Sequence, residues 1–479
     1  MKISGGRRRF SQGRERKAFA AVALLIALLL ATLHCRRAGG AAEDPVEQEA
    51  EDALVAYLRI DTTNPPGNET RGAAFLRDLL AKDGIDAQLV GADPARQAVY
   101  ARLDSGTDEK ALVLLSHIDV VAADASAWRN PPFEGKREGG YIWGRGALDD
   151  KSLTIAQLMA FVDLRRSGAK LQRDVIFLAV PDEELGGLQG AKRLLDEHAA
   201  LFDNVGFVLN EGGANETAVD KVLFWGIEVH QKVPLWLRLK AEAQGGHGAT
   251  PGKSGGASAK LVRALAAIDA IDTPYQLTDQ VARAAAIAGA ERKDGRGRSL
   301  ALLRHPLDVE AVERGLTASY KAMLRDTITI TTLRAGSGVN VVPPEAFAEI
   351  DIRLVPGSDP APMLERIREA VGENAEVEVL LAGEPSPESP AEGPLYETLK
   401  RAMLQASPGS AVGPIGTAGT TDSRFFRQKG ITAYGVSPFK VNYYDIDGAH
   451  GADERIRSRF FAEGVRLMRT IVRDFCAAK

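Results

Sequence analysis

Three apolar runs in the first half of the chain each end in side chains that can bind a metal ion. Residues 111–115, 175–180 and 205–209 are continuous apolar stretches of strand length. Such uninterrupted runs are typical of parallel strands that are buried on both faces. The carboxyl ends of parallel strands meet at one edge of an open α/β sheet, where ligands bind. The pattern therefore predicts a ligand-binding edge lined by acids and imidazoles.

The pattern changes near residue 229. Strands of alternating polarity and helices with one apolar face are expected at residues 233–240, 257–270, 327–333, 346–354, 361–371 and 375–381. This mixture predicts an α+β domain inserted into the first domain. Residues 276–325 add helical material within it. We place the catalytic domain at residues 43–228 and 385–479, and the inserted domain at 229–384.

Amphipathic helices and one further strand complete the α/β domain. Helices are expected at residues 46–58, 70–82, 395–405 and 460–475, and a strand at 432–437. The fold class is therefore α/β, with helices covering a sheet and a second, inserted α+β domain.

Residues 1–42 read as a targeting segment. Basic residues precede an apolar run at 18–33, and small residues follow at 38–42. The run is shorter than the roughly 20 residues that span a bilayer, which favours a signal peptide. An uncleaved N-terminal membrane anchor is the alternative. Either way, we expect an exported protein, periplasmic or extracellular.

Composition narrows the classes of partner. The chain has 479 residues, of which 45% are hydrophobic and 26% charged, as expected for a folded protein with at least two domains. Its formal net charge of −4 provides no basic surface for gripping nucleic acid. The two cysteines, Cys35 and Cys476, lie near opposite ends, which excludes a disulfide scaffold.

A glycine-rich bend places two consecutive acids, Asp149 and Asp150, directly before an apolar helical stretch. A carboxylate fixed on such a loop can hold a cation, and its two oxygens can bridge two metal ions. A plain turn whose aspartate caps the following helix is the alternative.

Two further pairs follow the apolar runs. His117 and Asp119 leave an extended strand on the same face, so that one can bind a metal while the other orients the imidazole. Glu183 and Glu184 point apart, so that one can bind a metal while the other moves protons. A solvated strand end and an acidic pair at a helix start are the alternatives. With Asp149, Glu211 and His450, these residues form an oxygen and imidazole set that suits zinc, and also cobalt or manganese.

These motifs resemble the M20 metallopeptidase family. The resemblance rests on residues 116–121, the W-x-x-P-P-F stretch at 128–133, residues 144–151, residues 182–187, and His450 before residues 454–456. It is strongest to the aminoacylase-1 and carboxypeptidase S branch. It implies a zinc-peptidase-like mixed sheet with an inserted ferredoxin-like lid or dimerisation domain, and a non-proline cis peptide between Asp149 and Asp150.

The resemblance assigns two zinc sites per subunit. It makes Asp149 the ligand that bridges both. His117 and Glu211 complete one site, and Glu184 and His450 complete the other. Asp119 then orients His117, and Glu183 is the general base and acid.

The resemblance also assigns substrate contacts. His247 matches a lid histidine that reaches the partner subunit's active site and stabilises the oxyanion, which implies a homodimer through the lid. Asn340 and Arg353 match residues that hold a substrate carboxylate, as do the backbone groups of Gly419 and Thr420. From the residues alone, His247 could equally be a loop histidine, Asn340 a turn asparagine and Arg353 an outward-facing strand arginine.

The expected function is hydrolysis of an amide or peptide bond in a small substrate with a free carboxylate, either a peptide or an N-acyl amino acid. A dipeptidase or aminopeptidase of the same family is one alternative, and a non-catalytic exported binding protein is another. The sequence does not define the acyl group.

Overall fold

The computed structural model describes residues 44–252, 255–441, 443–446 and 448–478. The chain divides into two units, Met1–Gln48 and Glu49–Lys479, and the features below belong to the second, except for the first residues of α2 (Pro45–Leu58). The predicted targeting segment lies outside the described residues. Within the described part of the chain, no helix has both the length and the apolar character needed to cross a membrane.

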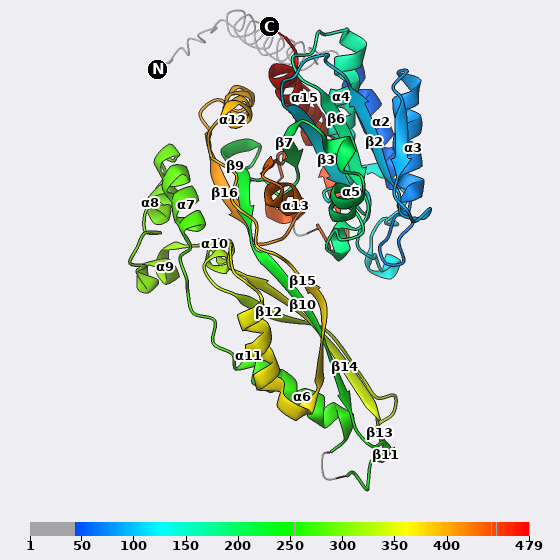
Figure 1. Ribbon diagram of the computed structural model, residues 1–479, viewed down its shortest axis with the longest axis vertical. Helices are drawn as coiled ribbons and strands as arrows, with labels where there is room; N and C mark the ends of the chain where they lie inside the picture. Colours follow the sequence, from blue (N-terminus) through cyan, green and yellow to red (C-terminus); the bar gives the residue numbers. More distant parts are fainter. Residues whose placement is uncertain (1–43, 253–254, 442, 447, 479) are drawn as a thin grey trace, which may run out of the picture. The chain divides into compact units, whose positions relative to one another are not determined.

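A large mixed sheet forms the core of the second unit (Figure 1). Its strand order is β1-β2-β6-β3-β7-β17-β9-β16, and β8 pairs with β9. The strands are β1 (Ala87–Val90), β2 (Ala98–Leu103), β3 (Ala111–His117), β6 (Val175–Val180), β7 (Val205–Asn210), β8 (Ala214–Ala218), β9 (Lys221–Gln231), β16 (Ala411–Thr417) and β17 (Thr432–Gly435). As predicted, β3 lies parallel to both β6 and β7, and every residue of β3 and β6 is buried.

Helices cover both faces of this sheet. On one face, α5 (Ala191–Glu197) and α13 (Ser423–Gln428) pack on alternate residues of β3 and β6. On the other, α4 (Lys151–Ser167) and α15 (Ser458–Cys476) bring Phe161 against Phe177 and Phe475 against Phe207. The helices α2 (Pro45–Leu58), α3 (Thr70–Lys82) and α12 (Pro394–Ala406) lie close to their predicted positions.

A second, antiparallel sheet has the order β12-β14-β10-β15. Its strands are β10 (Val233–Glu242), β12 (Thr327–Ala335), β14 (Glu345–Leu354) and β15 (Glu376–Ala382). The helices α6 (Gly256–Asp269) and α11 (Ala361–Val371) pack on one face. This succession of elements and strand order is ferredoxin-like, in agreement with the expected fold. The domain boundaries and the role of this sheet as a lid stay predictions.

Helices of the 276–325 segment pack on the large sheet. They are α7 (Asp279–Glu291), α8 (Gly295–Leu300), α9 (Val309–Gly315) and α10 (Ala318–Met323). Their apolar residues form one cluster with Phe224 of β9 and Ile415 of β16. The sequence indicated helices here but not that they cover β9 and β16, neither of which was predicted as a strand.

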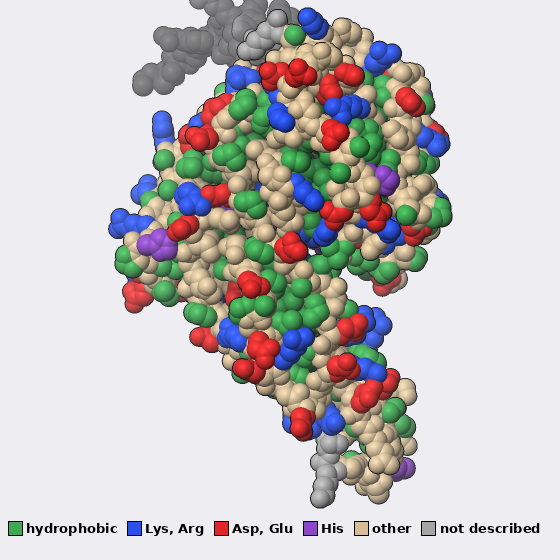
Figure 2. All heavy atoms as spheres, in the orientation of Figure 1, with side chains coloured by type: hydrophobic (Ala, Val, Ile, Leu, Met, Phe, Trp, Pro, Cys, Tyr) green, Lys and Arg blue, Asp and Glu red, His purple; other side chains and the backbone are tan. Residues whose placement is uncertain are grey.

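Short elements complete the fold. They are β4 (Lys136–Glu138), β5 (Tyr141–Trp143), β11 (Gly246–His247), β13 (Val341–Val342), α14 (Tyr443–Ile446) and β18 (Arg455–Arg457). Strand β18 pairs with β5, which joins the segment after His450 to the segment before Asp149. Acidic and basic side chains are interspersed over the face shown in Figure 2.

Candidate active site

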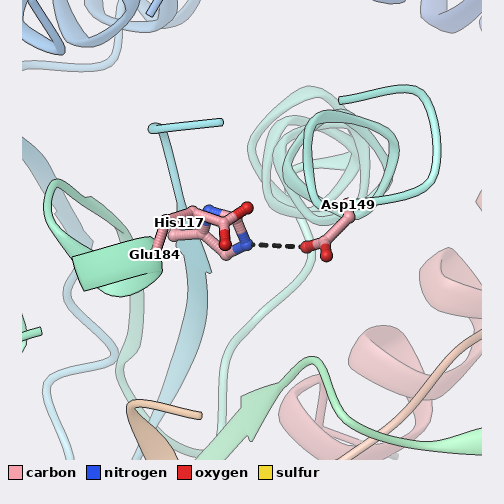
Figure 3. Close-up of side chains that lie close together, drawn as sticks. All are labelled: His117, Asp149 and Glu184. Atoms are coloured by element: carbon pink, nitrogen blue, oxygen red, sulfur yellow. Dashed lines mark hydrogen bonds and ion pairs between the residues drawn. The ribbon is translucent and has the colours of Figure 1, made fainter. Parts of the chain in front are cut away.

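The predicted metal-binding residues meet at the carboxyl edge of the large sheet. His117 ends β3, the 3-10 turn η2 (Glu183–Leu185) follows β6, and Glu211 follows β7. Asp149 comes from the loop between β5 and α4, and His450 from the loop after α14. Figure 3 shows His117, Asp149 and Glu184 close together, with the imidazole of His117 directed at the Asp149 carboxylate.

The Asp149 carboxylate lies between the two histidines. Its Oδ1 is 3.0 Å from Nε2 of His117, and its Oδ2 is 3.1 Å from Nε2 of His450. The same His450 nitrogen is 3.1 Å from Oε2 of Glu184. Ligand atoms of His117, Asp149 and Glu184 all lie within 4.8 Å of one another, as do those of His117, Glu183 and Glu211. The two oxygens of Asp149 are therefore placed to serve two neighbouring sites.

Electrostatics within the cluster favour a bound cation. Burial raises the pKa of Glu183 and of Glu211 well above the usual value, and neighbouring carboxylates such as Asp149 raise it further, although His117 acts in the opposite direction. The Oε1 atom of Glu184 is buried with no hydrogen-bond partner among the described residues. Hydrogen bonds to Asp149 and Glu184 raise the pKa of His450 to about 10. Buried carboxylates, an orphaned oxygen and two imidazoles fit divalent cations such as zinc.

Asp119 performs more than the predicted task. Its backbone carbonyl accepts from Nδ1 of His117 at 2.9 Å, which leaves Nε2 facing Asp149. Its carboxylate is 3.6 Å from that nitrogen and accepts the backbone N–H groups of Glu183 and Glu184, at 3.1 Å each. Asp119 therefore orients His117 mainly through its main chain, and it fixes the glutamate turn through its side chain.

The capping alternatives raised by the sequence are not what the structure shows. The Asp150 side chain makes no capping hydrogen bond to α4, and α5 begins after Gly190 rather than at Glu183 and Glu184. The peptide bond between Asp149 and Asp150 is cis, as the family resemblance implied.

A pocket joins this cluster to the second sheet. Asp149, Glu183, Glu184, Glu211 and His450 line one side of it. Arg353, Gly419 and Thr420 line it as well, together with Trp236, Leu381 and Arg424. Arg353 donates from Nη1 to the Thr420 hydroxyl, and from Nε to Asp351 at 2.6 Å. A guanidinium therefore lies in the same pocket as the acid cluster.

Comparison with known proteins identifies the family. A family model for peptidase family M20/M25/M40 matches residues 113–474. The chain belongs to this family. It is 30% identical to an N-fatty-acyl-amino acid synthase/hydrolase of Xenopus tropicalis, over 73% of this chain and 70% of the relative. It is 28% identical to aminoacylase-1 of Sus scrofa, over 86% of this chain and 91% of the relative.

A solved structure of the same family shares the fold. An M20 family metallo-carboxypeptidase from Sulfolobus solfataricus superposes with a TM-score of 0.69 at 22% identity, covering 88% of this chain and 98% of that structure. Family membership makes this M20 chain a metal-dependent hydrolytic enzyme. The alternative of a non-catalytic binding protein is therefore set aside.

Sequence reasoning missed the residue that joins the loop carrying Asp149 to the loop carrying His450 in this M20 enzyme. The carboxylate of Glu454 is fully buried and accepts the N–H groups of Gly146, Leu148 and Asp149, at 2.9, 2.7 and 3.1 Å. Arg145 donates to it from Nη1 at 2.7 Å. One acid, four residues after His450, thus holds the loop that carries Asp149. An acidic residue in a loop gives no local signal of this role.

Replacing Glu454 by glutamine is expected to weaken metal binding about 10- to 100-fold. The amide would keep one acceptor oxygen but turn an NH₂ group toward N–H donors, so the Asp149 loop would lose half of its support. Competition with a chelator of known affinity measures the change. Glu463→Gln is the control and is expected to bind metal normally, because Glu463 lies on α15, pairs with Lys440 and does not line the pocket. Unchanged affinity in Glu454→Gln would contradict this role.

The turn that carries Glu183 and Glu184 is also held by buried side chains. Arg424 is buried and donates from Nη2 to the carbonyl of Gly186 at 2.6 Å. On the other side, Asp182 has a positive φ of 76° and is held by Arg96 at 2.7 Å. The turn that carries Glu183 and Glu184 is thus fixed at both ends.

His247 and Asn340 do not join the cluster within this chain. Both are exposed, and they lie beside each other where the N–H of Gly248 donates to the carbonyl of Asn340 at 2.7 Å. Neither lines the pocket. Of the residues predicted to contact substrate, Arg353, Gly419 and Thr420 line the pocket of a single chain. Their contacts with substrate stay predictions, as do the role of Asn340 and that of His247 in a partner subunit's active site.

Proposed function

We propose that this enzyme uses two zinc ions to hydrolyse the amide bond of a small substrate with a free carboxylate, as an N-acyl amino acid amidohydrolase or a carboxypeptidase. His117, Asp149, Glu184, Glu211 and His450 would hold the metals, with cobalt or manganese as substitutes. The observation that carries the proposal is the position of Arg353, which lies in one pocket with the acid cluster. A guanidinium can bind a carboxylate bidentately. Aminoacylase-1 and the metallo-carboxypeptidase bear names consistent with such substrates.

Different side chains carry out different steps of the proposed reaction. Zinc bound at this cluster would supply a Lewis acid that polarises the carbonyl and lowers the pKa of water. Glu183 takes the proton from the attacking water and delivers it to the leaving amine nitrogen. Arg353, with the backbone groups of Gly419 and Thr420, holds the carboxylate so that the scissile amide lies at Glu183. His247 of the partner subunit stabilises the oxyanion, so the active enzyme would be a homodimer.

A substrate panel tests the proposal. N-acyl amino acids and peptides with free or blocked ends should be offered to zinc-loaded protein, and initial rates compared. Hydrolysis that requires a free carboxylate supports the proposal. Hydrolysis that instead requires a free amino terminus would favour a dipeptidase or aminopeptidase. We also propose that the protein is exported, which its location in fractionated cells would test.

Arg353→Ala is expected to raise KM about 10- to 100-fold for substrates with a free carboxylate, because a charged hydrogen-bonding partner is lost. For carboxyl-amidated substrates, KM should change little. Arg238→Ala is the matched control. Arg238 lies on the same face of strand β10 as Trp236 and pairs with Glu349, but it does not line the pocket. An equal effect of Arg353→Ala on free and amidated substrates would contradict carboxylate binding.

A further inference from the structure

One end of the four-stranded sheet presents an apolar wall to the pocket. Pro234 and Trp236 of β10 line it, with Leu381 of β15. In the strand register, Pro234 lies opposite Arg353, and Trp236 lies opposite Leu381. Residues opposite each other on neighbouring strands share a face. The guanidinium of Arg353, which donates to Asp351 and Thr420, therefore lies beside apolar side chains on one face of the sheet.

Strand alternation explains why these residues face the pocket. Leu235, Leu237 and Leu239 of β10 belong to the apolar cluster under α6 and α11. Successive side chains of a strand point to opposite faces, so Pro234 and Trp236 point away from that cluster. They are not needed for the core of this sheet, and they lie where a ligand can contact them.

Trp236 has two properties of a ligand-binding residue. Its ring lies 5.3 Å from the Arg353 guanidinium carbon, and the side chain is only half-buried. Its Nε1 atom is buried, yet it has no hydrogen-bond partner among the described residues. Buried indole N–H groups usually have an acceptor. Because this atom is buried, the part of Trp236 that a ligand in the pocket can contact is the exposed portion of its ring.

Leu381 extends the wall to the glutamate turn. A Cβ built on Gly186 would lie 2.7 Å from Cδ2 of Leu381, so the leucine side chain packs directly on that residue. Gly186 follows the turn that carries Glu183 and Glu184. The apolar surface therefore spans the region between the carboxylate-binding guanidinium and the hydrolytic acids.

The chemistry of the substrate places its side chain on this wall. In an N-acyl amino acid, the carboxylate, the scissile amide nitrogen and the side chain share one Cα. If the carboxylate lies at Arg353 and the amide at Glu183, that Cα lies between them, beside Trp236 and Leu381. A second guanidinium, that of Arg424, lines the pocket and disfavours basic side chains.

We propose that Trp236 is a specificity-determining substrate-binding residue. Its ring, with Leu381, contacts the side chain of the amino acid that bears the free carboxylate. The substrate class is then N-acyl derivatives, or carboxyl-terminal residues, of large apolar and aromatic amino acids. This inference rests on the proposed function, and it adds both the residue that selects the substrate and the kind of side chain selected.

Two variants test the role of the Trp236 ring. kcat/KM should be measured for one acyl group on phenylalanine, leucine and glycine. In Trp236→Ala, the ratio of the phenylalanine to the glycine substrate should fall at least about tenfold, since apolar contacts of this size discriminate by 10- to 200-fold. In Trp236→Phe, which keeps an aromatic ring, the ratio should be kept.

Trp225→Phe is the matched control, because Trp225 is a buried tryptophan that does not line this pocket. It should leave ratios and rates as in the wild type. A wild-type ratio in Trp236→Ala, or a ratio in Trp236→Phe as low as in Trp236→Ala, would overturn the selection role.

Calorimetric binding of free phenylalanine and glycine to the zinc-loaded protein separates this inference from the proposed function. If the wild type hydrolyses neither N-acyl amino acids nor peptides with a free carboxyl terminus, the proposed function fails. Tighter binding of phenylalanine that is lost in Trp236→Ala would still support the role of Trp236. Equal binding of both amino acids by the wild type would overturn it.

Discussion

Replacing Glu183 by glutamine is expected to reduce kcat by about 10²- to 10⁴-fold, the usual contribution of a general acid and base. Glutamine has nearly the same size but cannot accept a proton from water at neutral pH. Burial raises the pKa of Glu183, so its carboxyl can also hold a proton for the leaving amine. The turn that carries Glu183 is fixed by Asp119 and Arg424, so the substitution should leave the backbone in place. Steady-state rates on the best substrate measure the change.

The control for Glu183→Gln lies next to it. Glu184→Gln changes the neighbouring acid, whose Oε2 lies 3.1 Å from His450. If the assigned roles hold, Glu183→Gln keeps two metal ions and loses turnover, whereas Glu184→Gln loses metal as well. Near-normal turnover in Glu183→Gln would remove this residue from the proton transfer.

Asp149→Ala is expected to abolish activity and to reduce the metal content to less than one ion per chain. Its two oxygens lie against different histidines, His117 and His450, so one substitution removes a ligand from both proposed sites. Each proposed site would then keep only two ligands, His117 with Glu211 and Glu184 with His450. Elemental analysis after dialysis measures the metal content.

The fold of the Asp149→Ala variant needs an independent check. Asp149 is about a quarter exposed, and its side chain lies at the edge of the large sheet rather than in its core. Thermal unfolding should therefore remain cooperative, as monitored by circular dichroism. A variant that is folded and still holds two metal ions would show that Asp149 does not bridge them.

The sheet edge could be predicted from sequence because its signal is local. Strands β3 and β6 are uninterrupted apolar runs, and polar residues follow each run at once. Parallel strands end at a common edge, so His117 and the glutamate pair had to lie near each other. Asp149 and His450 lie on loops, and only their resemblance to a family pattern connected them with that edge.

Other features depend on contacts that sequence patterns do not encode. Strand β9 mixes apolar residues with Glu228 and His230, so it lacks the continuous run that identified β3. The periodicity of α7 shows that one face is buried, but not that Phe224 and Ile415 cover it. Glu454 interacts with backbone N–H groups more than 300 positions earlier in the chain, and no spacing rule connects them.

The central claim is that the cluster around Asp149 holds two divalent cations and that hydrolysis depends on both. The most direct test is a titration of metal-free protein with zinc, with hydrolysis of an N-acyl amino acid followed at each addition. The account predicts that activity rises from zero and reaches its maximum at two zinc ions per chain. Hydrolysis by the metal-free protein, or saturation of binding below two ions with full activity, would contradict it.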